Sequence, residues 1–257
     1  MIRNVRIALL TFVLVMVASQ TWLERWRSTR WSEPLFVSVY PIAADDSPVT
    51  QRYVAGLDAG RFAPIDAFFG REAARHGIRL DEPVKTRLHA PLDRLPPQRS
   101  PDDGVLRTIL WSLQLRYWAW KESGRVHEPE DIRLFVLYHD PALTATVPHS
   151  LGMREGLIGV VYAFAEPSMS AANDVVIAHE LLHTLGATDK YDPVDNAPRF
   201  PDGFGDPGQV PRYPQRTAEL MAGRRMLDAN HWEQPRSLDE VVIGPATAAE
   251  IHWPPVR

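Results

Sequence analysis

Two histidines, a glutamate, a glycine and an aspartate fall at fixed intervals in "VVIAHELLHTLGATDKYD", residues 175–192. His179 and His183 are four residues apart, so on an α-helix their imidazoles lie on one face and can hold one metal ion. Glu180 lies about 100° round the helix from His179, beside such an ion rather than aimed at it. A carboxylate in that place can accept a proton from a metal-bound water, so the segment predicts a catalytic zinc site.

Two imidazoles do not complete a catalytic zinc site, which uses three protein ligands and a water. The chain has no cysteine, so the third ligand has to be histidine, aspartate or glutamate. Gly186 can take the left-handed conformation that ends a helix and turn the chain so that Asp189 reaches the same ion. We therefore predict one Zn²⁺ held by His179, His183 and Asp189. The alternative third ligand is the more distant Glu219, which would leave Gly186 and Asp189 without a role.

The whole pattern, H-E-x-x-H-x-x-G-x-x-D in "HELLHTLGATD", resembles the long zinc motif of the metzincin metallopeptidases, in the branch whose last ligand is aspartate. That family also has a methionine turn beneath the metal, for which Met221 in "AELMAG" is the counterpart. A methionine in an apolar turn is equally typical of ordinary core packing. The direct resemblance covers residues 175–192 and 218–223. It implies an α+β fold in which a mixed sheet packs on helices, with a small loop-rich C-terminal part.

The resemblance implies that the protein is a zinc metallopeptidase acting on a protein or peptide substrate. Zinc would activate a water and polarise the scissile carbonyl, while Glu180 takes the proton of the water and passes it to the leaving amine. Tyr191 and Tyr213 are candidates to stabilise the oxyanion, although loop tyrosines more often pack their rings.

Two other functions remain open from the residues alone. One is a zinc hydrolase of a non-peptide amide, such as a cell-wall component. The other is a metal-stabilised, non-catalytic binding or scaffold protein of the cell envelope. Glu180 favours an enzyme, because a purely structural ion needs no general base.

The elements that position the motif can be predicted from periodicity. Strands are expected at residues 34–42, 84–92, 131–140 and 156–166, from their β-branched, aromatic and apolar content. Residues 60–77 predict a helix that ends at Gly77. The motif helix is expected to begin near Asn173 and to be anchored by an apolar side made of Ala178, Leu181, Leu182 and Leu185.

A further helix is expected after the Pro-rich connection "DRLPPQRSPDDG", with Asp102 or Asp103 as its cap. Six apolar residues of this helix recur at helical spacing and form one stripe, which we interpret as the side that faces the core. They are Leu106, Ile109, Leu110, Leu113, Tyr117 and Trp120. Residues 190–216 are rich in Pro, Gly and Asp and predict a long loop. The aspartates of this loop do not match a calcium-binding spacing, so we interpret them as turn residues. Pro245 marks the first turn of a short last helix.

The N-terminal segment differs from the rest of the chain. Residues 7–23 are uncharged and mostly apolar, with Arg3 and Arg6 ahead of them and more arginines behind. This favours a membrane anchor with a linker over residues 1–31. Two arginines before the run and three after it leave the positive-inside rule indecisive for its orientation. We expect the catalytic domain outside the cytoplasm. Signal-peptide cleavage after Ser19, giving a secreted protein, and a buried N-terminal helix are the alternatives.

Length and composition limit the number of domains and the kinds of partner. The 257 residues, 45% hydrophobic and 23% charged, predict one catalytic-sized domain over residues 32–257, with a C-terminal sub-part from about residue 187. The net charge of -4 comes from acidic and basic residues mixed along the chain. Since no basic stripe follows a phosphate backbone, nucleic acid is not an expected partner. The oligomeric state is left open by the sequence.

Overall fold

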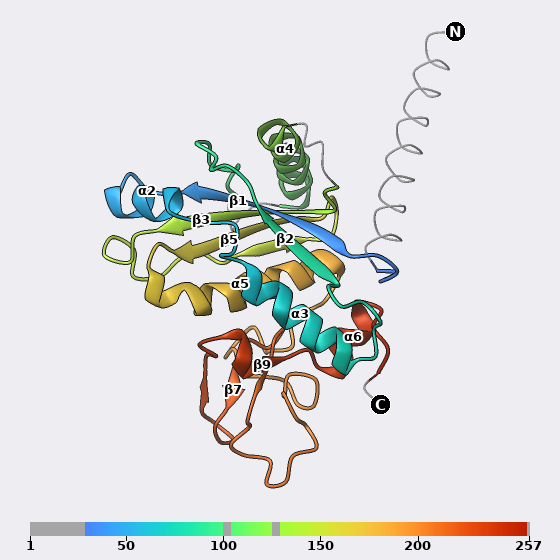
Figure 1. The fold of residues 1–257 in the computed structure, drawn as a ribbon. Helices are drawn as coiled ribbons and strands as arrows, with labels where there is room; N and C mark the ends of the chain where they lie inside the picture. The colour runs from blue at the N-terminus through green and yellow to red at the C-terminus, as the bar shows by residue number, and fades with distance from the viewer. Residues whose placement is uncertain (1–28, 100–103, 125–128, 256–257) are drawn as a thin grey trace.

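A computed structural model describes residues 29–99, 104–124 and 129–255, arranged around one five-stranded sheet (Figure 1). The strand order is β2-β1-β3-β5-β4, and only the edge strand β4 runs antiparallel to its neighbour. The strands are β1 (Leu35–Ala43), β2 (Val84–Leu88), β3 (Ile132–His139), β4 (Leu151–Met153) and β5 (Ile158–Phe164). The predicted strands are all present, whereas the short β4 was not expected.

Helices pack on both faces of this sheet. The helices of the described residues are α2 (Pro48–Ala55), α3 (Ala63–Arg75), α4 (Val105–Ser123), α5 (Ser170–Leu185) and α6 (Pro245–Glu250), and the last of these belongs to the C-terminal part. Single 3₁₀ turns are η1 (Pro167–Met169) and η2 (Leu238–Glu240). Sequence reasoning missed α2, whose start is fixed by Ser47 accepting a hydrogen bond from the Val49 N–H. The coarse prediction, an α+β fold with a sheet packed against helices, is confirmed. The sheet is mostly parallel.

The alternation of side chains along the strands divides the core into two layers. Val37 and Val39 of β1 pack with α3 and α5, while Tyr40 and Ile42 of the same strand face α4. Figure 1 shows α4 alone on one face of the sheet, with α3 and α5 on the other. The helix that carries the zinc motif and the helix α4 therefore lie on opposite sides of the sheet.

The prediction that one stripe of α4 faces the core is wrong. The buried side of α4 consists of Trp111, Leu115 and Ala119, which pack on the sheet. The predicted stripe, from Leu106 to Trp120, lies exposed on the outer side of the helix. Both sides of α4 are apolar, so periodicity could not identify the buried one. The expected caps Asp102 and Asp103 lie outside the described residues.

The motif helix α5 begins at Ser170, earlier than predicted. Asn173 is not a cap but lies within the first turn of the helix. Its side chain accepts from the Phe164 N–H and donates to the Phe164 carbonyl, at 3.1 and 2.9 Å. This pair of bonds fixes the start of α5 against the end of β5, so Asn173 positions the helix rather than starting it.

The C-terminal part contains little regular structure. It has four strands of two residues each, β6 (Ala218–Glu219), β7 (Arg225–Met226), β8 (Trp232–Glu233) and β9 (Val241–Val242). Residues 190–216 form neither helix nor strand, as predicted. Asp192, Asp195 and Asp206 each accept a hydrogen bond from the backbone N–H two residues later, which confirms that they are turn residues.

The expected membrane segment lies almost entirely outside the described residues, which begin at Thr29. Among the described residues, no helix has the length and apolar character needed to cross a bilayer.

Candidate metal centre

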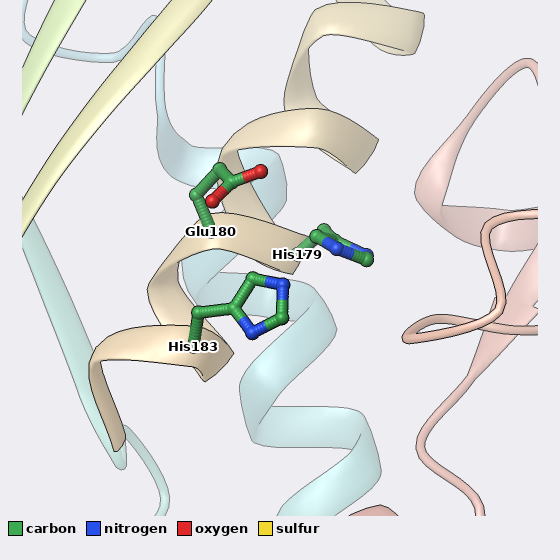
Figure 2. Close-up of side chains that lie close together, drawn as sticks. All are labelled: His179, Glu180 and His183. Atoms are coloured by element: carbon green, nitrogen blue, oxygen red, sulfur yellow. The ribbon is translucent and has the colours of Figure 1, made fainter. Parts of the chain in front are cut away.

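Helix α5 brings three potential metal ligands together. His179 and Glu180 project from one turn of the helix and His183 from the next (Figure 2), and one ligand atom from each lies within 4.8 Å of the others. The opposite side of the helix is anchored as predicted, because Ala178, Leu181, Leu182 and Leu185 are all buried. The described residues thus contain one His-Glu-His cluster able to hold a metal ion, on a helix that the core holds rigidly.

Both imidazole rings are oriented by backbone carbonyls. The Nδ1 atom of His179 lies 3.0 Å from the carbonyl oxygen of Leu220, and that of His183 lies 2.9 Å from the carbonyl oxygen of Ala187. A carbonyl oxygen can only accept, so each Nδ1 carries the proton and donates it. Each neutral ring is then left with a lone pair on Nε2, which is the arrangement used by metal-binding histidines.

Asp189 reaches the same point as the two Nε2 atoms. Helix α5 ends at Leu185, and the chain turns at its C-cap Gly186, whose φ of 101° is in the left-handed region as the sequence predicted. The Oδ1 atom of Asp189 lies 3.2 Å from Nε2 of His179 and 3.2 Å from Nε2 of His183. The structure therefore brings all three predicted ligands together, in addition to Glu180.

The three potential ligand atoms at this point suit a divalent cation. Two ring lone pairs and one carboxylate oxygen are all acceptors, and acceptors 3.2 Å apart repel unless a proton or a cation lies between them. In a tetrahedral zinc site with ligand bonds of about 2.0–2.1 Å, neighbouring ligand atoms are roughly 3.3 Å apart. The two separations from Asp189 are close to that value, so these residues can hold a divalent metal ion.

The electrostatics of the cluster favour positive charge. Burial alone would raise the pKa of Asp189, but the neighbouring His179 and His183 rings lower it below its usual range. Burial opposes protonation of His179, yet the Asp189 and Glu180 carboxylates raise its pKa above the usual value. The same attraction would act on a metal cation placed between these groups.

Glu180 is buried beside the ligand atoms and is only partly hydrogen-bonded. Its exposed fraction is 6%, and its Oε2 atom has no hydrogen-bond partner among the described residues. Burial raises the pKa of Glu180, while the neighbouring His179 and His183 and the Gly152 N–H partly offset this. A buried carboxylate with a raised pKa and one free oxygen is chemically suited to accept and return a proton.

Gly152 of the edge strand β4 allows this arrangement and was missed by sequence reasoning. A Cβ atom at this position would lie 2.3 Å from the Glu180 carbonyl oxygen and 2.5 Å from Cβ of His183. Only glycine lets β4 approach α5 closely enough for its N–H to reach the Glu180 carboxylate. A lone glycine between ordinary residues carries no signal of this contact in the sequence.

The segment that contains Met221 contacts the cluster through a backbone carbonyl. Met221 is fully buried in the core, and its carbonyl oxygen accepts a hydrogen bond from the Lys190 N–H at 3.0 Å. The preceding carbonyl, of Leu220, is the acceptor that orients His179. This turn therefore ties the chain after Asp189 to the ring of a predicted ligand, through backbone atoms that no residue pattern reveals.

The residue after Asp189 is held by the last helix. The buried Lys190 donates through Nζ to Glu250 of α6 at 2.7 Å. Glu250 also accepts from the N–H and the hydroxyl of Thr188, at 2.8 and 2.7 Å. The residues on both sides of Asp189 are thus fixed by one carboxylate, which limits where the Asp189 side chain can lie.

The other candidates lie in different surroundings. Glu219 is fully buried and accepts from Thr247 and two backbone N–H groups, so its carboxylate is occupied in the core and does not serve as the third ligand. Tyr191 interacts with Asp189, and burial together with that carboxylate raises its pKa. Tyr213 packs its ring 6.1 Å from that of Phe204. His149 is exposed.

Comparison with protein-family models and with curated proteins found no match for this chain.

Proposed function

We propose that this protein is a zinc-dependent metallopeptidase. The observation that carries the proposal is the meeting of three acceptors, from His179, His183 and Asp189, beside the unpartnered Oε2 atom of Glu180. A purely structural ion would need the first three groups only. The resemblance of the motif to that of the metzincins gives the same reaction class.

Each residue has a defined role in this proposal. His179, His183 and Asp189 would hold the zinc ion, which when bound lowers the pKa of a water and polarises a carbonyl. Glu180 accepts a proton from a water at its free oxygen and returns it to the leaving nitrogen of the substrate. Tyr191, beside Asp189, is the better placed of the two tyrosines to donate to the oxyanion.

The exposure of the three proposed ligands supports access to the cluster from solvent. The side chain of Asp189 is 40% exposed, whereas those of His179 and His183 are 16% and 20% exposed. The cluster is thus open to solvent on the Asp189 side and closed on the helix side. We also propose that residues 1–31 tether the domain to a membrane, with the cluster outside the cytoplasm.

Metal content tests the ligand set. The full chain is purified in detergent without chelator, and its zinc is measured by elemental analysis in wild type and in Asp189→Ala. One zinc per chain in the wild type, lost in the variant, is expected. The control is Asp202→Ala, which removes an exposed carboxylate from the same loop and should keep its zinc. A wild type without zinc would refute the proposal.

Glu180→Gln separates catalysis from binding. The variant should keep its zinc and lose hydrolysis of a denatured protein substrate by about 10²- to 10⁴-fold, the contribution of a general base. If the wild type cleaves peptidoglycan and not protein, the protein is instead a zinc hydrolase that acts on a cell-wall amide. A zinc-loaded wild type that cleaves neither substrate would favour a scaffold.

A further inference from the structure

The outer side of α4 is an exposed apolar surface. Its members, here called the α4 outer face, are between 52% and 78% exposed: Val105, Leu106, Ile109, Leu110, Leu113, Tyr117 and Trp120. They recur at helical spacing and form one continuous stripe along the helix. Exposed apolar patches of this kind mark sites where a protein meets a partner or a membrane.

The inner side of the same helix is already used. Trp111, Leu115 and Ala119 are buried against the sheet, so α4 is apolar on both sides. In a soluble protein, each apolar side of a helix is normally covered. Figure 1 shows no other element of the described residues lying over α4 on the side away from the sheet.

The polar residues of α4 indicate the charge of what covers it. The remaining exposed side chains of the helix are Arg107, Gln114 and Lys121, which are spaced by seven residues and line one edge of the α4 outer face. No carboxylate is among the exposed side chains of this helix. An apolar stripe with an arginine and a lysine on one edge, and a tyrosine and a tryptophan towards one end, is typical of a helix lying in the interface of an anionic bilayer.

The position of α4 relative to the start of β1, where the chain enters the domain, agrees with a membrane beside this helix. β1 and β3 are parallel, with Val37 beside Ile132, so the end of α4 that leads into β3 lies at the same end of the sheet as the start of β1. Tyr117 and Trp120 are at that end of α4. The uncharged run ends at residue 23, eight residues before Trp31, and eight residues span less than roughly 30 Å. A domain on so short a tether stays beside the bilayer.

We propose that the α4 outer face lies on an anionic lipid bilayer, with its apolar side chains at the boundary between headgroups and acyl chains. The proposal rests on the proposed membrane tether but not on the metal chemistry. Because α5 is on the opposite side of the sheet, this orientation directs the metal cluster away from the lipid surface. The protein would then act on substrates in the aqueous space rather than on lipids.

Spin labels in the full chain test this orientation. The chain has no cysteine, so single cysteines can be introduced without background. Leu113→Cys places a label on the α4 outer face, and Val194→Cys places one at a 91% exposed position in the C-terminal loop. Both proteins are reconstituted in vesicles of three parts phosphatidylcholine to one part phosphatidylglycerol, proportions chosen as roughly those of an anionic bilayer. Accessibility to oxygen and to a water-soluble nickel chelate is then measured by power saturation.

The expected result is a ratio of oxygen to nickel accessibility that is several-fold higher at position 113 than at position 194. High nickel accessibility at both positions would overturn the proposal by showing the face in water. Low accessibility to both reagents at position 113 would overturn it by showing a protein cover, either the N-terminal segment or a second copy. A chain that fails to float with the vesicles would refute the tether as well.

Discussion

Backbone atoms control the metal cluster as much as its side chains do. The two rings are oriented by the carbonyls of Leu220 and Ala187, and the proposed base, Glu180, is approached by the N–H of Gly152. None of these interactions depends on the chemical type of a partner side chain. The geometry of the cluster is therefore sensitive to the distance between β4 and α5.

Gly152→Ala tests that sensitivity. The added methyl group would meet the Glu180 carbonyl oxygen and Cβ of His183, both of which belong to the rigid helix α5. We expect the free energy of unfolding to fall by about 1–3 kcal/mol, as for other overpacked sites. Zinc affinity should fall as well, because His183 is displaced. Chemical denaturation and competition with a metal indicator measure the two quantities.

The matched control is Gly104→Ala, at the start of α4, where an added Cβ meets no atom within 4 Å. This variant should retain wild-type zinc affinity and lose little stability. Equal effects of the two substitutions would show that glycine flexibility, rather than the approach of β4 to α5, is what the cluster requires.

At the scale of elements, a half-buried carboxylate joins α3 to β2. Asp66 of α3 accepts from the N–H and the hydroxyl of Thr86 in β2, at 2.9 and 3.1 Å. Burial nevertheless raises the pKa of Asp66 to about 6, from an ordinary value of 3.8, with the Thr86 hydrogen bonds opposing the shift. The folded protein thus holds a proton on Asp66 more tightly than the unfolded chain does.

This shift predicts how stability depends on pH. Because the pKa of Asp66 is raised on folding, its contribution favours the folded state at pH 4 and is lost as the pH rises through about 6. Chemical denaturation of the wild type and of Asp66→Asn, at pH 4.5 and at pH 7.5, measures this contribution. The stability of the wild type relative to the variant should decrease between those two values. The exposed Asp81→Asn is the control, and an identical pH dependence in all three proteins would contradict the assignment.

For the whole molecule, a bound ion would join the sheet-and-helix layer to the C-terminal part. His179 and His183 belong to α5, while Asp189 lies in the chain beyond it, where Lys190 and Glu250 fix its neighbours. An ion at this point holds both parts in one arrangement. Its removal should therefore lower the stability of the entire protein and not only of the loop.

Chelation tests this coupling. A metal ion whose free concentration is a thousand times its dissociation constant stabilises the folded protein by about 4 kcal/mol. For a chain of this size, that corresponds to a shift of the thermal midpoint on the order of 10 °C. We expect a fall of that size in the thermal midpoint when a chelator is added to the wild type. Asp189→Ala should show no further fall. An unchanged wild-type midpoint would show that the two parts are not joined through a metal.

The sequence by itself determined the features that depend on neighbours along the chain. The spacing of His179 and His183 places their rings on one face of a helix, and Gly186 ends that helix in the left-handed conformation. The β-branched and apolar runs predicted the four longer strands correctly. These features follow from local backbone geometry, which a short window of residues fully specifies.

Only the tertiary structure decided which surfaces meet. The sequence could not show that Leu220, 41 residues after His179, orients that ring, or that Gly152 lies against α5. It also led to the wrong choice of the buried side of α4, because both sides of that helix are apolar. The physical reason is the same in each case. Periodicity identifies surfaces that need burial, but the contact that buries them depends on residues distant in the chain.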